Sequence, residues 1–390
     1  MEGKGNNSMG KAEKLERIKK ALAHEEGDRV PISDFFWTGF MKRARELWGS
    51  DVDMHRKFDL DYIVVTPNMD PVIQDFELLR EKGESTWLKT GFGATVLRKA
   101  DLPMPHFDEF SIKSPDDLAG FAIEPAGDDR RYERRGDDQI NGLGDAIVRN
   151  IAPWTERVGA YADDFPVFGS VCEGYEYAWR CMGTENALMW MLLEPEKFGG
   201  FMERVGDFLV DFTREQIARA AGRLSGMYIW GDVAYVNGML ISPDIWRGIF
   251  KPITKKIIDV CNDAGILTIY HGCGNATPIY NDFIEMGLGG YNPVECKAHL
   301  DVVELQPEYG GRLAFVGNVD VRELESGDRE RIKREVLYKL GAAQGGGYIM
   351  QSDHSVSSEV APESYAYMVE LVREYGRYPL DMERLRSELR

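Results

Sequence analysis

The sequence lacks the features that would attach a protein to a membrane or to a nucleic acid. No unbroken apolar run reaches the length of a membrane span. The first 23 residues are polar and rich in lysine, without the apolar segment of a signal peptide. Basic residues are also short in supply, because 47 of them face 65 acidic residues and give a formal net charge of -18. Such a charge repels nucleic acid and anionic lipid, so we expect a cytoplasmic protein with neither as a partner.

Cysteine is scarce as well. The 390 residues include five cysteines, an odd number with irregular spacing, which argues against a disulfide scaffold and indicates reduced thiols. A cysteine with a special role is therefore expected to be a metal ligand or a nucleophile. No internal repeat or low-complexity tract is present, and a composition of 43% hydrophobic and 29% charged residues is typical of a folded globular protein.

Eight short runs of β-forming residues, each followed by a turn residue and then by a helical pattern, predict parallel strands joined by helices. They are residues 29–33, 62–66, 166–170, 227–230, 266–270, 289–292, 313–316 and 348–350. Amphipathic patterns between them predict helices at 195–221, 244–264, 277–286 and 329–341. We therefore predict an α/β fold, a single (β/α)8 TIM barrel. A doubly wound open sheet is the alternative, but its glycine-rich turn is missing after the first run, where the sequence reads Ser33-Asp-Phe-Phe-Trp37.

The predicted domain organisation has three parts. Residues 1–25 form a polar N-terminal extension and a first helix, and residues 26–385 form the barrel. An insertion of about 68–163 follows the second strand, and two β-rich runs on either side of Gly91-Phe-Gly93 predict a hairpin within it.

Polar residues follow nearly every predicted strand. Catalytic groups of a barrel come from the C-terminal strand ends, so we take four of these residues as candidate catalytic groups: Asp34, Asp232, Glu295 and Asn318. For Asp232, a role as a helix N-cap is nearly as well supported.

The segment His271-Gly-Cys273 follows the fifth predicted strand with the spacing of a chelating pair. Imidazole and thiolate together suit zinc, and a catalytic zinc site has three protein ligands and one open position. We predict His354, after the last strand, as the third metal ligand, while Glu295 or Asp353 can supply a carboxylate. The alternative is a hydrogen-bonded histidine beside a small packed cysteine. Asp353 can orient His354 or cap the next helix.

Aromatic residues cluster after several of the predicted strands, where they can wall a pocket for a flat ring or pack in the core. They are Phe35, Phe36, Trp37, Tyr175, Tyr177, Trp179, Tyr235 and Tyr291.

Three segments together resemble the uroporphyrinogen decarboxylase superfamily, over about Lys11 to Tyr378. They are Ile18-Lys-Lys-Ala-Leu-Ala-His-Glu-Glu-Gly-Asp-Arg-Val-Pro-Ile32, His271-Gly-Cys-Gly-Asn275, and Gly346-Gly-Tyr-Ile-Met-Gln-Ser-Asp-His354 with Val360-Ala-Pro-Glu363. The resemblance implies a (β/α)8 barrel and either a decarboxylase or a corrinoid-dependent methyltransferase. The decarboxylases carry an Arg-Gln-Ala-Gly-Arg-Tyr type of motif after the first strand, where this sequence reads Asp34-Phe-Phe-Trp-Thr-Gly39.

The methyltransferase branch resembles this chain better, because its members bind zinc through a His-x-Cys pair and a further cysteine near the last strand. Here Ser352-Asp-His354 replaces that cysteine. The resemblance thus implies zinc held by His271, Cys273 and His354. Such a zinc ion is suited to polarising the oxygen of a small, for instance methoxylated aromatic, donor whose methyl group passes to a corrinoid (cobalamin), as in O-demethylation.

The corrinoid itself is expected on a separate protein that docks over the barrel mouth. The signature Asp-x-His-x-x-Gly is absent, and its nearest approach, Asp53-Met-His55-Arg-Lys-Phe58, lacks the glycine. Two alternatives remain, a metal-free lyase of the uroporphyrinogen decarboxylase type and a non-catalytic barrel that binds a small ligand. Dimers are common in such families, so a homodimer is the assembly that the resemblance suggests.

Overall fold

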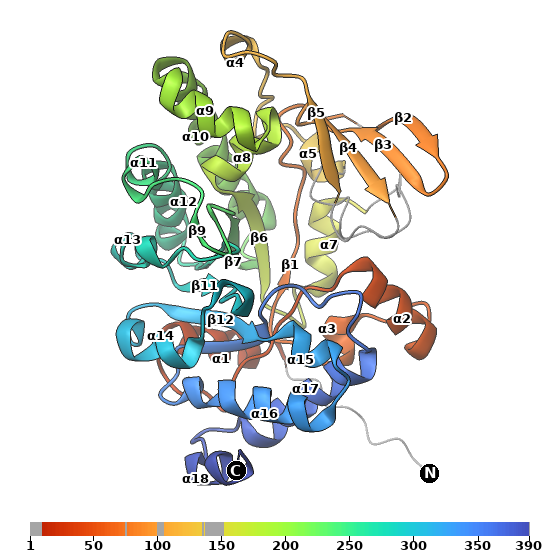
Figure 1. Ribbon diagram of the computed structural model, residues 1–390, viewed down its shortest axis with the longest axis vertical. Coiled ribbons are helices and arrows are strands. Elements are labelled where there is room, and N and C mark those ends of the chain that lie inside the picture. Colours follow the sequence, from red (N-terminus) through yellow and green to blue (C-terminus); the bar gives the residue numbers. More distant parts are fainter. Residues whose placement is uncertain (1–9, 75, 100–104, 135, 137–151, 390) are drawn as a thin grey trace.

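A single curled sheet of parallel strands forms the centre of the protein (Figure 1). The computed structural model describes residues 10–74, 76–99, 105–134, 136 and 152–389. Within them, seven strands lie side by side in chain order. They are β1 (Ile63–Val64), β6 (Val167–Cys172), β7 (Leu224–Trp230), β10 (Leu267–His271), β11 (Gly290–Asn292), β12 (Ala314–Val319) and β13 (Tyr348–Ser352).

The segment predicted as the first strand closes this sheet. Ile32 forms a parallel bridge with Met350 of β13, and the Met350 N–H donates to Pro31 O at 2.9 Å. On the other side, the N–H of Asp61, just before β1, donates to Ile32 O at 2.8 Å. The segment is a set of isolated bridges rather than a strand, because Pro31 has no N–H and the Ile32 N–H bonds to the Asp61 side chain. The predicted (β/α)8 barrel is therefore confirmed, and the open sheet is excluded.

Asp61 ties this segment to the rest of the barrel through a buried ionic network. Its carboxylate pairs with Arg17 and accepts hydrogen bonds from Arg29 Nη1 at 2.8 Å and from the Ile32 N–H at 2.6 Å. Arg17 also donates to Asp28 at 2.6 and 2.7 Å. Asp61 has no exposed surface, so its charge is compensated entirely by these partners.

Helices surround the sheet on its outer side (Figure 1). After β6 come α8 (Gly174–Met182), α9 (Thr184–Leu193), α10 (Pro195–Ala220), α11 (Pro243–Ile249), α12 (Lys251–Asp263), α13 (Tyr280–Met286), α14 (Val302–Tyr309), α15 (Val321–Glu325), α16 (Arg329–Leu340), α17 (Pro362–Tyr375) and α18 (Met382–Glu388). The helix predicted over 244–264 is two helices that meet at Phe250, because Pro252 cannot donate a helical hydrogen bond. None of the described helices is both long and apolar enough to cross a membrane.

Further helices precede β6. They are α1 (Lys11–Leu22), α2 (Thr38–Trp48), α3 (Met54–Lys57), α4 (Asp117–Gly120), α5 (Arg130–Glu133) and α7 (Trp154–Tyr161). Between β1 and β6 the chain also forms a four-stranded antiparallel sheet of β2 (Glu77–Lys82), β3 (Ser85–Lys89), β4 (Ala94–Lys99) and β5 (His106–Phe110). The predicted hairpin around 91–93 corresponds to the pairing of β3 with β4. Parts of the predicted insertion, 100–104 and 137–151, lie outside the described residues.

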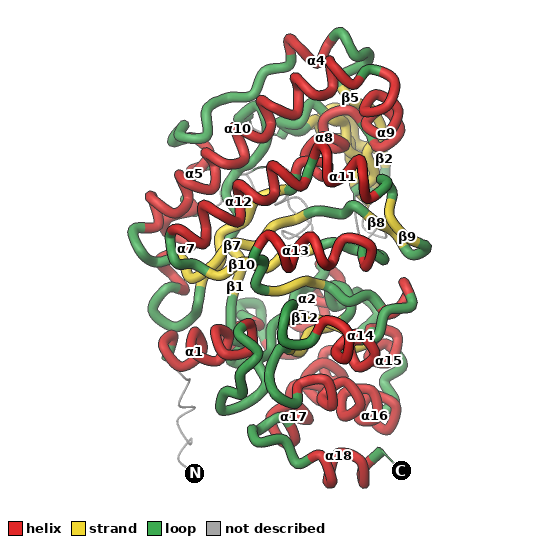
Figure 2. Tube along the Cα trace, turned by 90° about the vertical axis from the view of Figure 1, so that its left-hand side faces the viewer, coloured by secondary structure: helices red, strands yellow, loops and turns green. Residues whose placement is uncertain are grey.

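The barrel has a closed lower end and an open mouth. Ile18, Ala21 and Leu22 of α1 pack into one cluster with inward-facing residues of the strands, among them Tyr228 and Ile349. Burying each large apolar side chain in such a cluster contributes about 1.5–3 kcal/mol to folding. Figure 2 shows α1 at one end of the strands and the short hairpin of β8 (Ala234–Tyr235) and β9 (Gly238–Met239) at the opposite end. The polar strand ends lie at this second end, the mouth.

Candidate metal centre at the mouth of the barrel

Three possible ligands meet where β7 and β10 end. The two strands are neighbours with His271 opposite Trp230, so the loops Gly231-Asp232 and Gly272-Cys273 run side by side. Ligand atoms of Asp232, His271 and Cys273 lie within 4.8 Å of one another. Cys273 Sγ is 3.6 Å from His271 Nε2, which is 3.9 Å from Asp232 Oδ1. Tetrahedral zinc with bonds of about 2.3 Å to sulfur and about 2.0–2.1 Å to nitrogen requires an S···N distance of about 3.6 Å, so the pair fits this ion.

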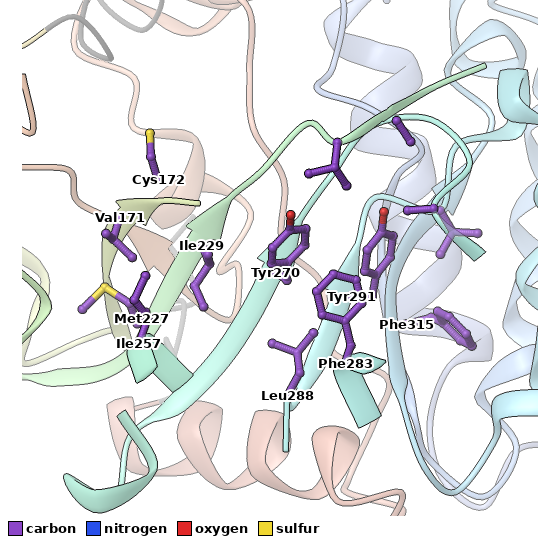
Figure 3. Packing of buried hydrophobic residues seen from close by; sticks show 14 of the residues in the cluster. Val171, Cys172, Met227, Ile229, Ile257, Tyr270, Phe283, Leu288, Tyr291 and Phe315 are labelled. Carbon is purple, nitrogen blue, oxygen red and sulfur yellow. The ribbon is translucent and has the colours of Figure 1, made fainter. Parts of the chain in front are cut away.

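Glycines allow the two loops to come this close. A Cβ atom at Gly231 would lie 2.1 Å from the Tyr270 hydroxyl oxygen, and one at Gly274, whose φ is +79°, would lie 2.5 Å from the Tyr235 backbone. Two tyrosines hold the loops in place. The Tyr270 hydroxyl donates to Gly231 O at 2.9 Å, and the Tyr291 hydroxyl donates to Gly272 O at 2.7 Å. Figure 3 shows these two tyrosines among the buried residues that pack with Phe283.

Two carboxylates fix the Cys273 loop. The Cys273 N–H donates to Asp232 Oδ1 at 2.9 Å, and the Gly274 N–H donates to Glu295 Oε2 at 2.8 Å. Asp232 and Glu295, both predicted from the sequence as catalytic groups, are thus brought to the same place. Each side chain fixes the direction in which the Cys273 backbone leaves β10.

His271 is oriented from below by a residue that the sequence reasoning did not select. His271 Nδ1 lies 2.6 Å from Oδ1 of Asn292, which is paired with it across β10 and β11. The signal was present, since Asn292 is a polar residue at the end of the sixth predicted strand. It could have been found only by knowing the register between the two strands.

Burial changes the protonation of the three possible ligands. Burial lowers the pKa of His271 to about 4, so its ring is neutral at pH 7, and burial raises the pKa of the Cys273 thiol well above its usual value. Desolvation by the surrounding protein raises the pKa of Asp232. The hydrogen bond from the Cys273 N–H lowers that pKa in part. The Asp232 side chain is 45% exposed. A bound cation would favour the thiolate, with release of its proton.

His354, the predicted third ligand, follows β13 and is not brought into this group. Its Nδ1 accepts the Ser355 N–H at 2.8 Å, and its ring meets that of Trp37 edge-on. Burial lowers the pKa of His354, as does nearby His271, whereas Glu295 and Asp232 raise it. The neutral ring therefore carries its proton on Nε2. In this arrangement the free nitrogen of His354, Nε2, offers an N–H group and no lone pair for a metal ion.

The other two predicted catalytic residues are buried and form hydrogen bonds within the protein. Asp34 is buried and accepts hydrogen bonds from the Ser352 hydroxyl at 2.6 Å and the Ser352 N–H at 3.2 Å, which joins the first barrel segment to β13. Burial raises the pKa of Asp34 to about 8. Asn318 is also buried, and its amide bonds to the backbone of Val294, Leu300 and Val302.

The Asp353 carboxylate neither bonds to His354 nor caps α17, and it belongs to no group of metal ligands among the described residues. Its carboxylate accepts the Cys296 N–H at 3.0 Å and the Val321 N–H at 2.9 Å, so it joins the loops after β11 and β12. Burial raises its pKa to about 7.

The predicted aromatic wall is present only in part. Tyr175, Tyr177 and Tyr291 are fully buried core residues, and the partly buried Phe36 stacks on Phe40 of the core. Partly exposed rings remain at Phe35, Trp37 and Trp179, and Tyr235 is exposed on the β8–β9 hairpin. A further aromatic residue, Trp230, lies against His271 with ring centroids 4.8 Å apart.

Comparison with known proteins places this barrel in a family. The model of the family described as Uroporphyrinogen decarboxylase (URO-D) matches residues 147–375, more than half of the chain. The chain belongs to the uroporphyrinogen decarboxylase family. This member of the family is 25% identical over 183 residues to the uroporphyrinogen decarboxylase of Syntrophotalea carbinolica and 24% identical over 187 residues to that of Psychromonas ingrahamii. In both cases the match spans about half the length of the relative.

Another relative matches over nearly its whole length. The Methylcobamide:CoM methyltransferase MtbA of Methanosarcina mazei is 22% identical over 363 residues, which cover 92% of this family member and 97% of the relative. A solved structure, a methyltransferase from Methanosarcina mazei, superposes with a TM-score of 0.63 at 18% identity and covers 93% and 98% of the two chains. The shared fold therefore extends over the entire barrel.

Proposed function

We propose that this protein is a zinc-dependent methyltransferase that moves a methyl group from a small donor to a corrinoid protein. The observation that carries the proposal is the chelating pair His271 and Cys273, whose S···N distance of 3.6 Å fits zinc, with Asp232 beside it. A uroporphyrinogen decarboxylase has no evident need for a thiol and an imidazole at this spacing. The full-length similarity to a protein named as a methylcobamide methyltransferase supports the same branch.

His271, Cys273 and Asp232 would hold the ion, and its fourth position would stay open to water or to the donor. When bound, zinc supplies a Lewis acid that polarises an oxygen atom of the donor. The chain's own residues keep these ligands in place through the hydrogen bonds from Cys273 to Asp232 and from Gly274 to Glu295. His354, with its proton on Nε2, is a hydrogen-bond donor for the leaving oxygen.

The partly exposed rings near His271 favour a flat donor. The ring centroids of Phe35 and Trp230 lie 5.4 Å apart, and the ring of Trp37 packs edge-on against that of His354. Such rings provide an apolar wall with few directional contacts, which suits a methoxylated aromatic ring. The corrinoid would come on a separate protein, since the chain lacks a corrinoid-binding signature of its own.

The proposal is tested by methyl transfer from a panel of methoxylated aromatic compounds to cob(I)alamin, with the zinc-loaded protein. We expect methylcobalamin to form with at least one donor, as measured by its absorption spectrum, and formation to stop after the metal is removed with a chelator. Zinc-loaded protein that transfers no methyl group from any donor would reject the proposed reaction.

Asp232 and His354 can be separated as third ligands by alanine substitution. Asp232→Ala is expected to lower the zinc affinity on the order of 100-fold, because it removes a ligand from the group. His354→Ala is expected to retain about one zinc ion per chain and to lose methyl transfer, because it removes an N–H donor. Zinc binding is measured by competition with a chromophoric chelator. A larger loss of zinc affinity in His354→Ala than in Asp232→Ala would instead assign His354 as the third ligand.

A carboxy-lyase is the second candidate function, and the family match and the decarboxylase relatives favour it. Such an enzyme would act on a small acid without a metal. It predicts carbon dioxide release that survives chelation and the Cys273→Ala substitution. The methyltransferase predicts the loss of its activity under both treatments.

A further inference from the structure

The side chain of Asn292 connects His271 to the interior of the barrel. Asn292 Oδ1 lies 2.6 Å from His271 Nδ1, and it also accepts the hydroxyl proton of Tyr228. The Asn292 Nδ2 group donates to Val316 O at 2.9 Å. Asn292 and Tyr228 are completely buried, and they come from β11 and β7, the two strands that flank β10.

These contacts determine where the imidazole proton lies. The carbonyl of Val316 can only accept a hydrogen bond, so the NH₂ group of Asn292 faces it and the amide oxygen faces His271. That oxygen can also only accept, so Nδ1 of His271 must donate the proton between them. A neutral imidazole with its proton on Nδ1 has its lone pair on Nε2. Nε2 is the atom that lies 3.6 Å from Cys273 Sγ.

We propose that Asn292 is a positioning residue that keeps His271 in the Nδ1–H tautomer and thereby directs its Nε2 lone pair toward Cys273. Tyr228 supports Asn292 from the interior cluster, where its ring packs with Phe35 and Trp230. The consequence for zinc affinity rests on the proposed function, whereas the tautomer is a property of the metal-free chain.

Nitrogen-15 NMR of metal-free protein labelled at histidine tests the tautomer directly. The chain has six histidines, so His271 is assigned by the loss of its signals in a His271→Gln variant. We expect a pyrrole-type Nδ1 and a pyridine-type Nε2 in the wild type. The same pattern is expected in Asn292→Asp, whose buried carboxyl can keep a proton toward Val316 O. Asn292→Leu removes the acceptor, so His271 should change to the Nε2–H form or to a mixture.

Tyr228→Phe is the matched control, because it removes a second contact of Asn292 and leaves the acceptor of His271 in place. It should keep the Nδ1–H pattern. An Nε2–H pattern for His271 in the wild type overturns the proposal, even if Asn292→Leu fails to fold. An unchanged Nδ1–H pattern in folded Asn292→Leu overturns it as well.

Zinc affinity provides an independent readout. Losing a residue that orients a metal-binding histidine weakens metal binding by about 10–100-fold. We expect Asn292→Leu to show this loss in competition with a chelator and Asn292→Asp to restore most of the affinity. If the tautomer changes as expected while the wild type binds no zinc, the inference about Asn292 stands and the proposed function fails. If the affinity of Asn292→Leu equals that of the wild type, the positioning role fails.

Discussion

Cys273→Ala is expected to reduce the bound zinc from about one ion per chain to almost none and to abolish methyl transfer. A structural zinc ion contributes about 10–16 kcal/mol over its whole ligand set, so one thiolate accounts for a loss of affinity on the order of 10²–10³-fold. Alanine also leaves His271 and Asp232 with no soft ligand beside them. Metal content is measured by plasma mass spectrometry on protein dialysed against a weak chelator.

Cys296→Ala is the matched control for this experiment. Cys296 is partly exposed like Cys273 and follows the next strand, but its sulfur lies 3.5 Å from Asn318 O and belongs to no metal-ligating group among the described residues. The Cys296→Ala variant should keep about one zinc ion per chain and its methyl-transfer activity. Equal zinc in Cys273→Ala and the wild type would contradict the assigned site, and a wild type that stays metal-free after zinc is added would favour the lyase.

The second large effect concerns stability. Asp61→Asn is expected to lower the free energy of unfolding by about 3–5 kcal/mol, because it removes the charge that compensates two buried arginines, Arg17 and Arg29. It also weakens the bond to the Ile32 N–H, which fixes the closing segment of the barrel. Urea unfolding followed by circular dichroism measures this change.

A surface ion pair provides the comparison. Asp211 pairs with Arg214 on α10, and both side chains are 61% exposed. Asp211→Asn should leave the urea midpoint almost unchanged, because solvent screens such pairs. A midpoint for Asp61→Asn that matches that of Asp211→Asn would mean that the buried network contributes no net stability to the barrel.

Most of the barrel could be predicted from the sequence, because buried parallel strands are short β-rich runs separated by amphipathic helices. The exceptions have local causes. The 29–33 segment has the pattern of a strand but forms only bridges, since Pro31 lacks a donor and an aspartate side chain replaces a strand partner. In the four-stranded sheet, the glycines around 91–93 indicate the β3–β4 turn, whereas β2 is exposed along its whole length and has no alternating pattern.

The parts of the site that depend on local residue spacing could be predicted from the sequence. His271 and Cys273 are two residues apart, and Asp232 directly follows a predicted strand. Asn292 needed the pairing of β10 with β11, which no local pattern contains. Asp34, Asn318 and Asp353 are polar strand-end residues like Asp232, but their side chains are buried in hydrogen bonds within the protein, whereas Asp232 lies beside His271 and Cys273. Only the folded chain distinguishes these two uses of the same residue types.

The position of α1 at the base of the barrel affects the order in which the reactants of the proposed reaction bind. Ile18, Ala21 and Leu22 fill the lower end, so the mouth is the route to His271 through the part of the chain that the structure describes. In the proposed reaction, a small donor and a much larger corrinoid protein both approach through the mouth. The donor must then enter first, and the protein that covers the mouth must leave before the demethylated product can. Steady-state kinetics would accordingly be sequential and ordered, with excess corrinoid protein acting as a dead-end inhibitor.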